Sequence, residues 1–246
     1  MGTARRTAGI VGIATVTVAA LTGCIPSPPP VPQPSPAEPI VPGATSAGEV
    51  REGMVPAGGT STVELQVDER SAVVIGATSP DDEDLTLHLT GPGVDVENDD
   101  AHSELDVFAF ELDSRDPALA AVLEPGAYSI EVGEWSDDRS SFELQALTTA
   151  ATVPAGTSAD FDFAPGAPAI AIVPLAEGDE SIAATSDVDT TLWAYLPESD
   201  TEYRDDDSGG DRNPLIELPG ERPQDAVVVA TGYDRDESGS LQLTVG

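Results

Sequence analysis

The sequence predicts an all-β protein made of two tandem antiparallel β-sandwiches of jelly-roll-like type, which follow an N-terminal segment rich in proline. Three observations lead to this fold class. The 246 residues include 22 prolines and 23 glycines, which favours short strands and many turns over long helices. Apolar residues alternate with polar ones at the period of two that half-buried strands show, and no stretch has a convincing helical period. The alternating runs recur in the same order after about 95 residues, a spacing far too long for a solenoid repeat.

The first 23 residues have the organisation of a secretory signal peptide. Arg5 and Arg6 form a positive start, and residues 8–20 form an apolar run interrupted by small residues. This run is shorter than the roughly 20 residues that a bilayer span requires. The adjacent arginines leave open whether export uses the general secretory or the twin-arginine route, although Ala8 and Gly9 disfavour the second.

The only cysteine of the chain, Cys24, follows Leu21, Thr22 and Gly23. This order resembles the lipobox of bacterial lipoproteins. The resemblance implies that diacylglycerol is attached to the Cys24 sulfur, that the chain is cleaved before this residue, and that the protein is held at the cell membrane on its extracytoplasmic face. The alternatives are a secreted protein with an incidental cysteine, or an uncleaved anchor.

Residues 24–47 predict a stalk between this anchor and the first domain. Nine prolines lie between Ile25 and Pro42. Such a segment favours extended polyproline II at about 3.1 Å per residue, which would raise a domain some 50 Å above the membrane.

The rest of the chain predicts a duplicated domain, with one copy over residues 48–149 and a diverged copy over residues 150–246. The turn sequence Val-Pro-Ala-Gly at 55–58 recurs at 153–156, and an alternating run follows each time. We expect the two runs to be equivalent strands: Val63, Leu65 and Val67 in the first copy, and Phe161 and Phe163 in the second.

Further matches follow in the same order along the two copies. The strand after Asp84 matches the strand after Asp189, and the final strand at 142–144 matches residues 241–243. The penultimate strands are expected to pair as Tyr128, Ile130 and Val132 before Gly133 with Val227, Val229 and Thr231 before Gly232. Turn residues at 91–93, 125–126 and 208–210 separate these strands, which is typical of a β-sandwich.

The first copy resembles the bacterial pre-peptidase C-terminal domain family. The resemblance rests on the segments 84–89, 91–93, 98–100, 123–132 and 142–144. It covers Gly48 to Leu147 well and Thr152 to Val245 less well, because residues 222–225 replace the Pro-Gly-x-Tyr turn of the first copy. The resemblance implies a compact β-sandwich, usually appended to secreted enzymes, with relatives that bind calcium and extracellular polymers.

The charge of the chain restricts its partners. Ten arginines stand against 45 acidic residues, for a formal net charge of −35. A field of this sign repels nucleic acid and anionic lipid headgroups and concentrates cations. Nucleic-acid binding is therefore excluded, and most of the carboxylates are expected to be solvated surface groups.

Two acidic clusters are candidate calcium sites, because calcium is bound by six to eight converging oxygen ligands. Each combines an aspartate at the start of one strand with acidic or amide residues after the next, and consecutive strands commonly pair. The candidate ligands are Asp84, Asn98, Asp99 and Asp100 in the first copy, and Asp189, Asp205, Asp206 and Asp207 in the second. The alternative is a pair of solvated acidic turns, and Ile216 at the twelfth position from Asp205 excludes a standard EF-hand.

Four aromatic residues are candidate ligand-binding groups. If Leu192 and Leu196 face the core, Trp193 and Tyr195 point to the opposite face of their strand. Such a pair can stack on a sugar or grip a peptide, but packing between the two domains is the preferred alternative. Trp135 and Tyr233 are expected in equivalent loops, where they are exposed.

No set of residues indicates an enzyme. His88 alternates with the core leucines and His102 follows an acidic loop, and neither has a visible nucleophile and orienting acid beside it. Carboxylates are too numerous to single out an acid–base pair, so a carboxylate-based hydrolase is a remote hypothesis. The sequence favours a non-catalytic, membrane-anchored protein whose two β-sandwiches bind an extracellular polymer or protein, with calcium as a candidate cofactor. The second hypothesis is an accessory or substrate-presenting subunit of an extracytoplasmic enzyme or transporter.

Overall fold

A computed structural model of the chain describes residues 48–100 and 107–246. The predicted signal peptide, the lipidation site at Cys24 and the proline-rich stalk lie outside these residues, as does His102. The described residues form sixteen β-strands. Among them, no helix is long and apolar enough to cross a membrane.

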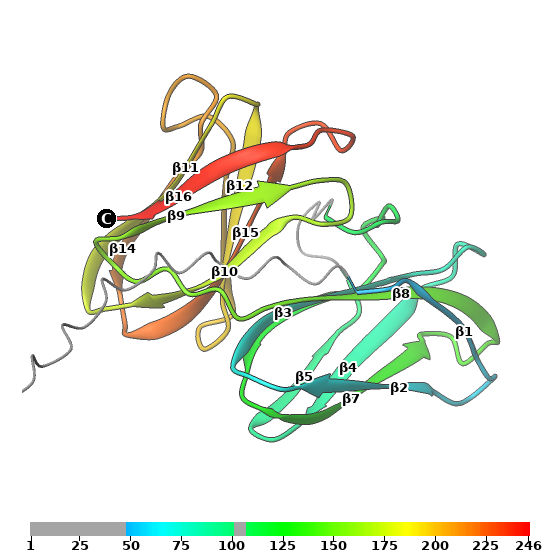
Figure 1. Cartoon of the computed structure of the whole chain (residues 1–246). Coiled ribbons are helices and arrows are strands. Elements are labelled where there is room, and N and C mark those ends of the chain that lie inside the picture. Colours follow the sequence, from blue (N-terminus) through cyan, green and yellow to red (C-terminus); the bar gives the residue numbers. More distant parts are fainter. Residues whose placement is uncertain (1–47, 101–106) are drawn as a thin grey trace, which may run out of the picture. The chain divides into compact units, whose positions relative to one another are not determined.

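The first eight strands form two four-stranded antiparallel sheets (Figure 1). One sheet has the order β1-β8-β3-β6 and the other the order β2-β7-β4-β5. The strand bounds are β1 Arg51–Val55, β2 Ser61–Val67, β3 Ser71–Thr78, β4 Leu85–Gly91, β5 Val94–Asn98, β6 Ala118–Leu123, β7 Gly126–Glu134 and β8 Ser140–Thr149.

The last eight strands repeat this arrangement. Their sheets have the orders β10-β15-β12-β13 and β14-β11-β16-β9. Each strand therefore has the same neighbours as the strand numbered eight lower in the first sandwich, and β9 corresponds to β1, β10 to β2, and so on. The strand bounds are β9 Ser158–Phe163, β10 Ala169–Leu175, β11 Gly178–Ser186, β12 Thr190–Leu196, β13 Thr201–Asp205, β14 Leu215–Glu221, β15 Gln224–Gly232 and β16 Gly239–Val245. The prediction of tandem antiparallel β-sandwiches is confirmed.

One of the predicted strand equivalences is wrong. The alternating run at Val63 belongs to β2, whereas the run at Phe161 belongs to β9, whose counterpart in the first sandwich is β1. The shared Val-Pro-Ala-Gly sequence begins at the last residue of β1 in one copy and precedes β9 in the other. Gly58 and Gly156 both have positive φ, at 65° and 74°, so the recurring sequence marks a common turn chemistry at two different places.

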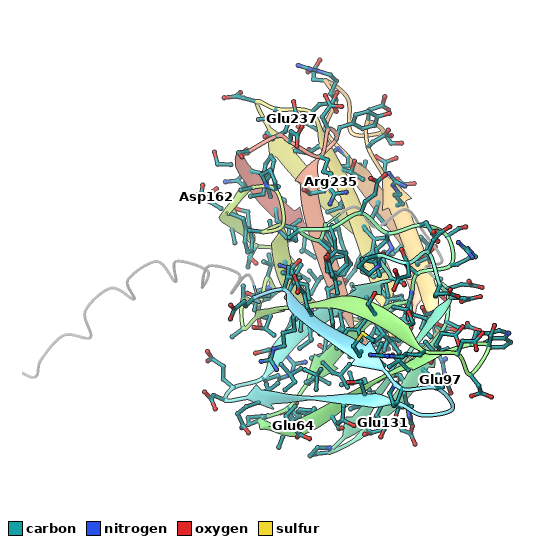
Figure 2. All side chains as sticks on the ribbon, turned by 90° about the vertical axis from the view of Figure 1, so that its right-hand side faces the viewer. Glu64, Glu97, Glu131, Asp162, Arg235 and Glu237 are labelled. Carbon is teal, nitrogen blue, oxygen red and sulfur yellow. The ribbon has the colours of Figure 1, made fainter. Side chains whose placement is uncertain are left out.

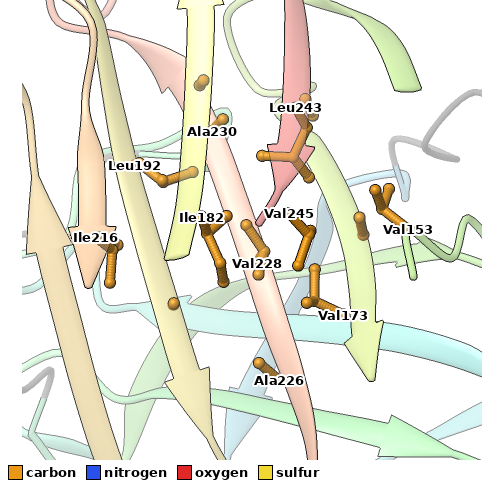
Figure 3. Packing of buried hydrophobic residues seen from close by; sticks show 14 of the residues in the cluster. Val153, Val173, Ile182, Leu192, Ile216, Ala226, Val228, Ala230, Leu243 and Val245 are labelled. Carbon is orange, nitrogen blue, oxygen red and sulfur yellow. The ribbon is translucent and has the colours of Figure 1, made fainter. Parts of the chain in front are cut away.

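Each sandwich has its own apolar core between its two sheets. In the first, alternate residues of β4 and β7 supply Leu85, Leu87 and Leu89, and Tyr128, Ile130 and Val132. In the second, Leu192, Ala194 and Leu196 of β12 belong to one cluster with Ile182 of β11 and Leu243 and Val245 of β16. Figure 3 shows Leu192, Ile182, Leu243 and Val245 in this core. Full burial of each large aliphatic side chain stabilises the fold by about 1.5–3 kcal/mol.

A third apolar cluster joins residues of both sandwiches. It contains Val74 from β3, Phe108 from the segment before β6, Ile172 from β10 and Val229 from β15. The Arg235 guanidinium donates a hydrogen bond to the Phe108 carbonyl oxygen at 3.2 Å, and the Arg70 guanidinium pairs with the Asp225 carboxylate. The sheet with β15 is therefore buried on both faces.

This burial explains a second correction to the expected equivalences. Leu85 pairs with Glu134 in the first sandwich and Thr190 pairs with Gly232 in the second. The counterparts of Tyr128, Ile130 and Val132 are consequently Ala226, Val228 and Ala230, one residue away from the predicted set. Val227 and Val229 face the third cluster instead, because a shift of one residue reverses the face of a strand.

Candidate functional site

Each sandwich presents an aromatic side chain beside an aspartate where two central strands end. The Trp135 amide donates to the Asp84 carbonyl oxygen at 2.9 Å, and the Tyr233 amide donates to the Asp189 carbonyl oxygen at 2.9 Å. These matching bonds extend the β4–β7 and β12–β15 ladders by one position. Trp135 and Tyr233 thus occupy equivalent loop positions, as the sequence predicted.

Both of these aromatic side chains are accessible. Trp135 is 66% exposed and Tyr233 is 56% exposed, and they are the two exposed aromatic residues of the described chain. Large apolar side chains at such exposure have no role in the core, so they are available to contact another molecule.

Asp84 lies in a strongly acidic environment. Burial raises the pKa of the Asp84 carboxyl, and the negative charges of Asp100, Asp99 and Glu134 raise it further. The Arg115 guanidinium acts in the opposite direction. The structure therefore brings three of the four predicted ligands of the first copy into one neighbourhood.

Glu134 is a member of this neighbourhood that the sequence analysis missed. It is only 7% exposed, and its Oε2 accepts a hydrogen bond from the Asp138 amide at 2.6 Å. Its Oε1 is buried and has no partner within the described residues. Its position in the alternating run of β7, two residues after Val132, was the available signal that its side chain points inward.

Asn98 and Asp205 have a structural role that competes with metal binding. Asn98 Oδ1 accepts a hydrogen bond from the Ala118 amide at 3.0 Å, at the start of β6. Asp205 Oδ2 accepts from the Leu215 amide at 2.8 Å, at the start of the equivalent strand β14, and from the Ser208 amide at 2.9 Å. These bonds, with one from the Ser208 hydroxyl, lower the pKa of Asp205 despite the opposing effect of burial.

An arginine stands near the predicted metal ligand of each sandwich. The Arg212 guanidinium is 3.9 Å from the Asp189 carboxylate, and Arg115 is close enough to lower the pKa of Asp84. Arg115 also pairs with Asp82 at 3.0 Å and with Asp113 at 3.5 Å. Both arginines come three residues before the strand that follows the acidic loop, at Ala118 and Leu215.

These contacts do not make a complete calcium donor set. Among residues 48–100 and 107–246, no three His, Cys, Asp or Glu residues are arranged to hold a metal ion. The Asn98 and Asp205 oxygens are engaged with backbone amides, and a fixed positive charge stands near Asp84 and Asp189. The remaining predicted ligands of the second copy, Asp206 and Asp207, lie in the turn after β13, where the Asp207 carbonyl oxygen accepts from the Gly210 amide.

A further pair of polar residues closes the same loops and was not anticipated. Asp116 Oδ2 accepts from the Thr78 hydroxyl at 2.9 Å and from the Asp113 amide at 2.8 Å. Asn213 Oδ1 accepts from the Ser186 amide at 2.9 Å. Both residues stand two positions before the next strand and hold it to the end of the third strand of their sandwich.

Trp193 and Tyr195 lie on the face of β12 opposite to the core of the second sandwich, as expected. Trp193 is 8% exposed and belongs to the third apolar cluster, against which Tyr195 also packs. The two rings stack with centroids 5.7 Å apart, Trp193 Nε1 donates to Glu202 Oε2, and Tyr195 Oη donates to Asp200 Oδ1. Burial and the Asp200 bond raise the pKa of Tyr195 to about 12. These contacts favour the alternative of packing between the sandwiches over ligand binding.

His88 is placed by the sheet register between two acidic side chains. Its Nε2 is 2.7 Å from Asp95 Oδ1, and its Nδ1 is 3.9 Å from Glu131 Oε2. Neither of these two neighbours is a serine, threonine or cysteine, so they do not form with His88 the hydroxyl- or thiol-based triad of a hydrolase.

Comparisons with known proteins give distant structural similarity alone. A scan against models of known protein families finds no match, and neither does a search of curated proteins. One similar solved structure is the pre-peptidase C-terminal domain of a collagenase from Bacillus anthracis, with 13% identity and a TM-score of 0.34 over 39% of this chain and 93% of that chain. The PBSX exported protein XepA has 11% identity and a TM-score of 0.29 over 81% of this chain and 87% of that one.

A third similar structure is latent PorU from Porphyromonas gingivalis. It has 9% identity and a TM-score of 0.21, over 81% of this chain and 22% of its own. Similarities at this level carry no argument about function.

Proposed function

We propose that this protein is a non-catalytic binding protein, displayed outside the cell from a lipid on Cys24, and that Trp135 and Tyr233 mark its binding surfaces. The observation that carries the proposal is the placement of these two exposed aromatic residues at equivalent corners of the two sandwiches. Acidic groups surround the first corner, and the side chains of Asp95 and Glu131 that contact His88 do not complete a hydroxyl- or thiol-based triad with it. Aromatic rings beside carboxylates suit recognition of a sugar polymer or of a protein surface.

Anchoring can be tested separately from binding. Replacement of Cys24 with serine removes the sulfur that would carry the lipid, and it lies outside both sandwiches. The Cys24→Ser protein is expected in the soluble fraction with an unchanged melting temperature, measured by fractionation and circular dichroism. Retention of this variant in the membrane fraction contradicts the lipid anchor.

Binding is tested with the soluble Cys24→Ser protein on arrays of cell-wall glycans, matrix proteins and peptides. A double variant, Trp135→Ala with Tyr233→Ala, is expected to lose at least about tenfold in affinity for any ligand found, the size of a hot-spot effect. Because both side chains are exposed, the variant keeps its stability to within about 0.5 kcal/mol.

Val96→Ala is the matched control, since Val96 is an exposed apolar residue, at 37%, that pairs with Leu89 of β4, whereas Leu85 at the other end of β4 pairs with Glu134 next to Trp135. This control is expected to bind as the parent does. Equal loss of affinity in the control and the double variant contradicts the proposed surfaces, and so does the absence of any saturable ligand on all three arrays.

A further inference from the structure

The second sandwich carries an extra extended segment on one edge. The residues that link the two sandwiches run beside β10, where Thr152 pairs with Ile172 in a parallel bridge. The Ile172 amide donates to the Ala151 carbonyl oxygen at 2.8 Å, and the Val153 amide donates to the Ile172 carbonyl oxygen at 2.9 Å. Ala151 and Val153 are buried in the core of that sandwich, at 6% and 1% exposure. The linker thus completes both the edge and the core.

The matching edge in the first sandwich is the free side of β2. Val63 of β2 pairs with Ile130, and the equivalent pair in the second sandwich is Ala171 with Val228, so Glu64 corresponds to Ile172. β2 is the outermost strand of its sheet, and within the described residues no strand or bridge pairs with its free side. Among residues 48–100 and 107–246, the backbone amide and carbonyl of Glu64 therefore lack the counterparts that Ala151 and Val153 give to Ile172.

A groove lies beside this free edge, where the second sandwich holds Ala151 and Val153. Its volume is about 170 Å³, and it lies between the two sheets of the first sandwich. Residues from the start of the first sandwich and from β1, β2, β7 and β8 line it. The apolar lining residues are Val63, Leu65, Ile130, Leu144 and Ala146, and the others are Gly48, Glu49, Arg51, Glu64, Gln66 and Thr148. The groove has room for two small apolar side chains of an added strand.

The β2 edge lacks most of the features that usually prevent strand addition, and Glu64 is its one charged residue. All seven of its residues pair with β7 in continuous register, without a bulge, and it contains neither proline nor a basic residue. The equivalent strand β10 contains Pro174 and is covered by the linker. An uncovered, regular edge is a template for pairing with an extended peptide.

The charge beside this edge indicates the chemistry of the peptide. Glu64 is exposed and lies on the outer face of its sheet, where Figure 2 shows it on the same side of the first sandwich as Glu131. In parallel pairing, the peptide residue that takes the place of Thr152 projects its side chain on the same face as Glu64. A lysine or arginine there gains a favourable interaction with the carboxylate, while the flanking side chains enter the groove.

We propose that the free edge of β2 and its groove bind an extended segment of a partner protein, with small apolar residues at two alternate positions and a basic residue between them. The segment lies parallel to β2, as Ala151–Val153 lie parallel to β10. This site is separate from the Trp135 and Tyr233 corners and does not depend on them.

A segment of this chain is the other occupant to consider. Gly53 of β1 lies opposite Phe142, as Phe161 of β9 lies opposite Leu241, and in this register Gly43, Ala44 and Thr45 correspond to Ala151, Thr152 and Val153. Thr45 would stand where Val153 fills the core, and its hydroxyl matches the apolar side chains of the groove less well than the second methyl group of valine does. None of the three is basic, so the Glu64 carboxylate favours a partner segment with a central lysine or arginine.

The proposal is tested by nuclear magnetic resonance of the soluble Cys24→Ser protein with two synthetic peptides. One has the sequence of residues 149–154 of this chain, and the other differs by lysine at the position of Thr152. Both are expected to shift the amide signals of Thr62, Glu64 and Gln66 saturably and to slow hydrogen exchange at Glu64. The lysine peptide is expected to bind about two- to fivefold more tightly at low salt, the size of an exposed ion pair.

Three variants separate the contributions. Glu64→Gln is expected to remove the preference for lysine and to leave binding of the parent peptide unchanged. Ala146→Leu fills the groove and is expected to weaken both peptides. Glu97→Gln is the matched control, because Glu97 is an exposed carboxylate on β5, the opposite edge of the same sheet, and it is expected to change neither peptide.

Several results overturn the proposal. The first is a Glu64 amide that is already protected from hydrogen exchange without peptide, which would show that residues before Gly48 cover the edge. The second is an equal change in peptide affinity in Glu97→Gln and Glu64→Gln. The third is the absence of peptide-induced shifts in the amide signals of β2. The Trp135→Ala, Tyr233→Ala variant is expected to bind both peptides normally, so failure here and failure of the proposed function are distinguishable.

Discussion

At the scale of single residues, Asp116 and Asn213 occupy equivalent positions in the two sandwiches and make similar connections with different side chains. Each accepts hydrogen bonds that hold a loop to the end of the third strand of its sandwich. Asp116 is a carboxyl only 5% exposed, and burial raises its pKa in spite of the hydrogen bonds it accepts. Asn213 makes the equivalent connection without an ionisable group.

The raised pKa gives a pH-dependent prediction for Asp116→Asn. The native state holds the Asp116 proton more tightly than the unfolded chain does, so this contribution to the free energy of unfolding is present at acid pH. It is lost as the pH rises through the raised pKa. The melting temperature of Asp116→Asn, relative to the parent protein, is therefore expected to rise between pH 3 and pH 7.

Asn213→Asp is the reciprocal variant. It introduces a carboxyl at the equivalent position and is expected to lower the free energy of unfolding by about 1–3 kcal/mol at neutral pH, and by less at acid pH. Parallel pH profiles for the parent protein and both variants would contradict the account.

At the scale of elements, the loops before β6 and β14 each bring an arginine toward an aspartate. Arg115 acts on Asp84, and Arg212 is 3.9 Å from Asp189. A guanidinium at this position reduces the repulsion among the neighbouring carboxylates without a metal ion.

Replacing both arginines tests their role against that of calcium. In the parent protein, millimolar calcium and magnesium are expected to change the melting temperature equally, because both ions only screen the acidic surface. In the double variant Arg115→Gln with Arg212→Gln, no guanidinium compensates the carboxylates, so the melting temperature is expected to fall. Calcium is expected to restore the melting temperature of this variant more fully than magnesium does. A calcium-specific rise in the parent protein, measured by calorimetry after chelation, would instead support the calcium sites that the sequence predicted.

The elements also show what the sequence could specify. Alternation identified β4, β7 and β12 because each has one face toward its own core, and turn residues separated them correctly. It did not fix the register of β15, where Val227, Val228 and Val229 are all buried, because this strand has apolar neighbours on both faces. The engagement of the Asn98 and Asp205 oxygens with β6 and β14 depends on contacts across 10 to 20 residues, which spacing alone does not reveal.

At the scale of the whole molecule, the third apolar cluster is expected to make the two sandwiches unfold together. Phe108 is 1% exposed, stacks on Phe110 with centroids 5.5 Å apart, and belongs to this cluster with Ile172 and Trp193. Segments on either side of the linker therefore share one buried surface. From the sequence, Trp193 could serve either as a ligand-binding group or in this packing role, since an aromatic residue opposite a core face suits both.

Phe108→Ala tests this coupling. Loss of a buried aromatic side chain typically costs about 3–5 kcal/mol, and the loss falls on the surface between the sandwiches. The single calorimetric transition expected for the parent protein should separate into two, each with part of the original enthalpy. Leu87→Ala, within the core of the first sandwich, is the control and is expected to destabilise without this separation. A single transition in Phe108→Ala would contradict the coupling.

The pairing of the first and last strands of each sandwich has a mechanical consequence. Arg51 at the start of β1 lies opposite Leu144 of β8, and the chain leaves β8 at Thr149, near the same end. Tension between a tethered Gly48 and a ligand held by the second sandwich would therefore pull two neighbouring strand ends apart. The hydrogen bond from the Gln145 side chain, whose Nε2 donates to the Gly48 carbonyl oxygen at 2.9 Å, would break first, and the backbone bonds between β1 and β8 would follow one after another. The first sandwich is thus expected to yield to low force and to lengthen the tether before its ligand is released.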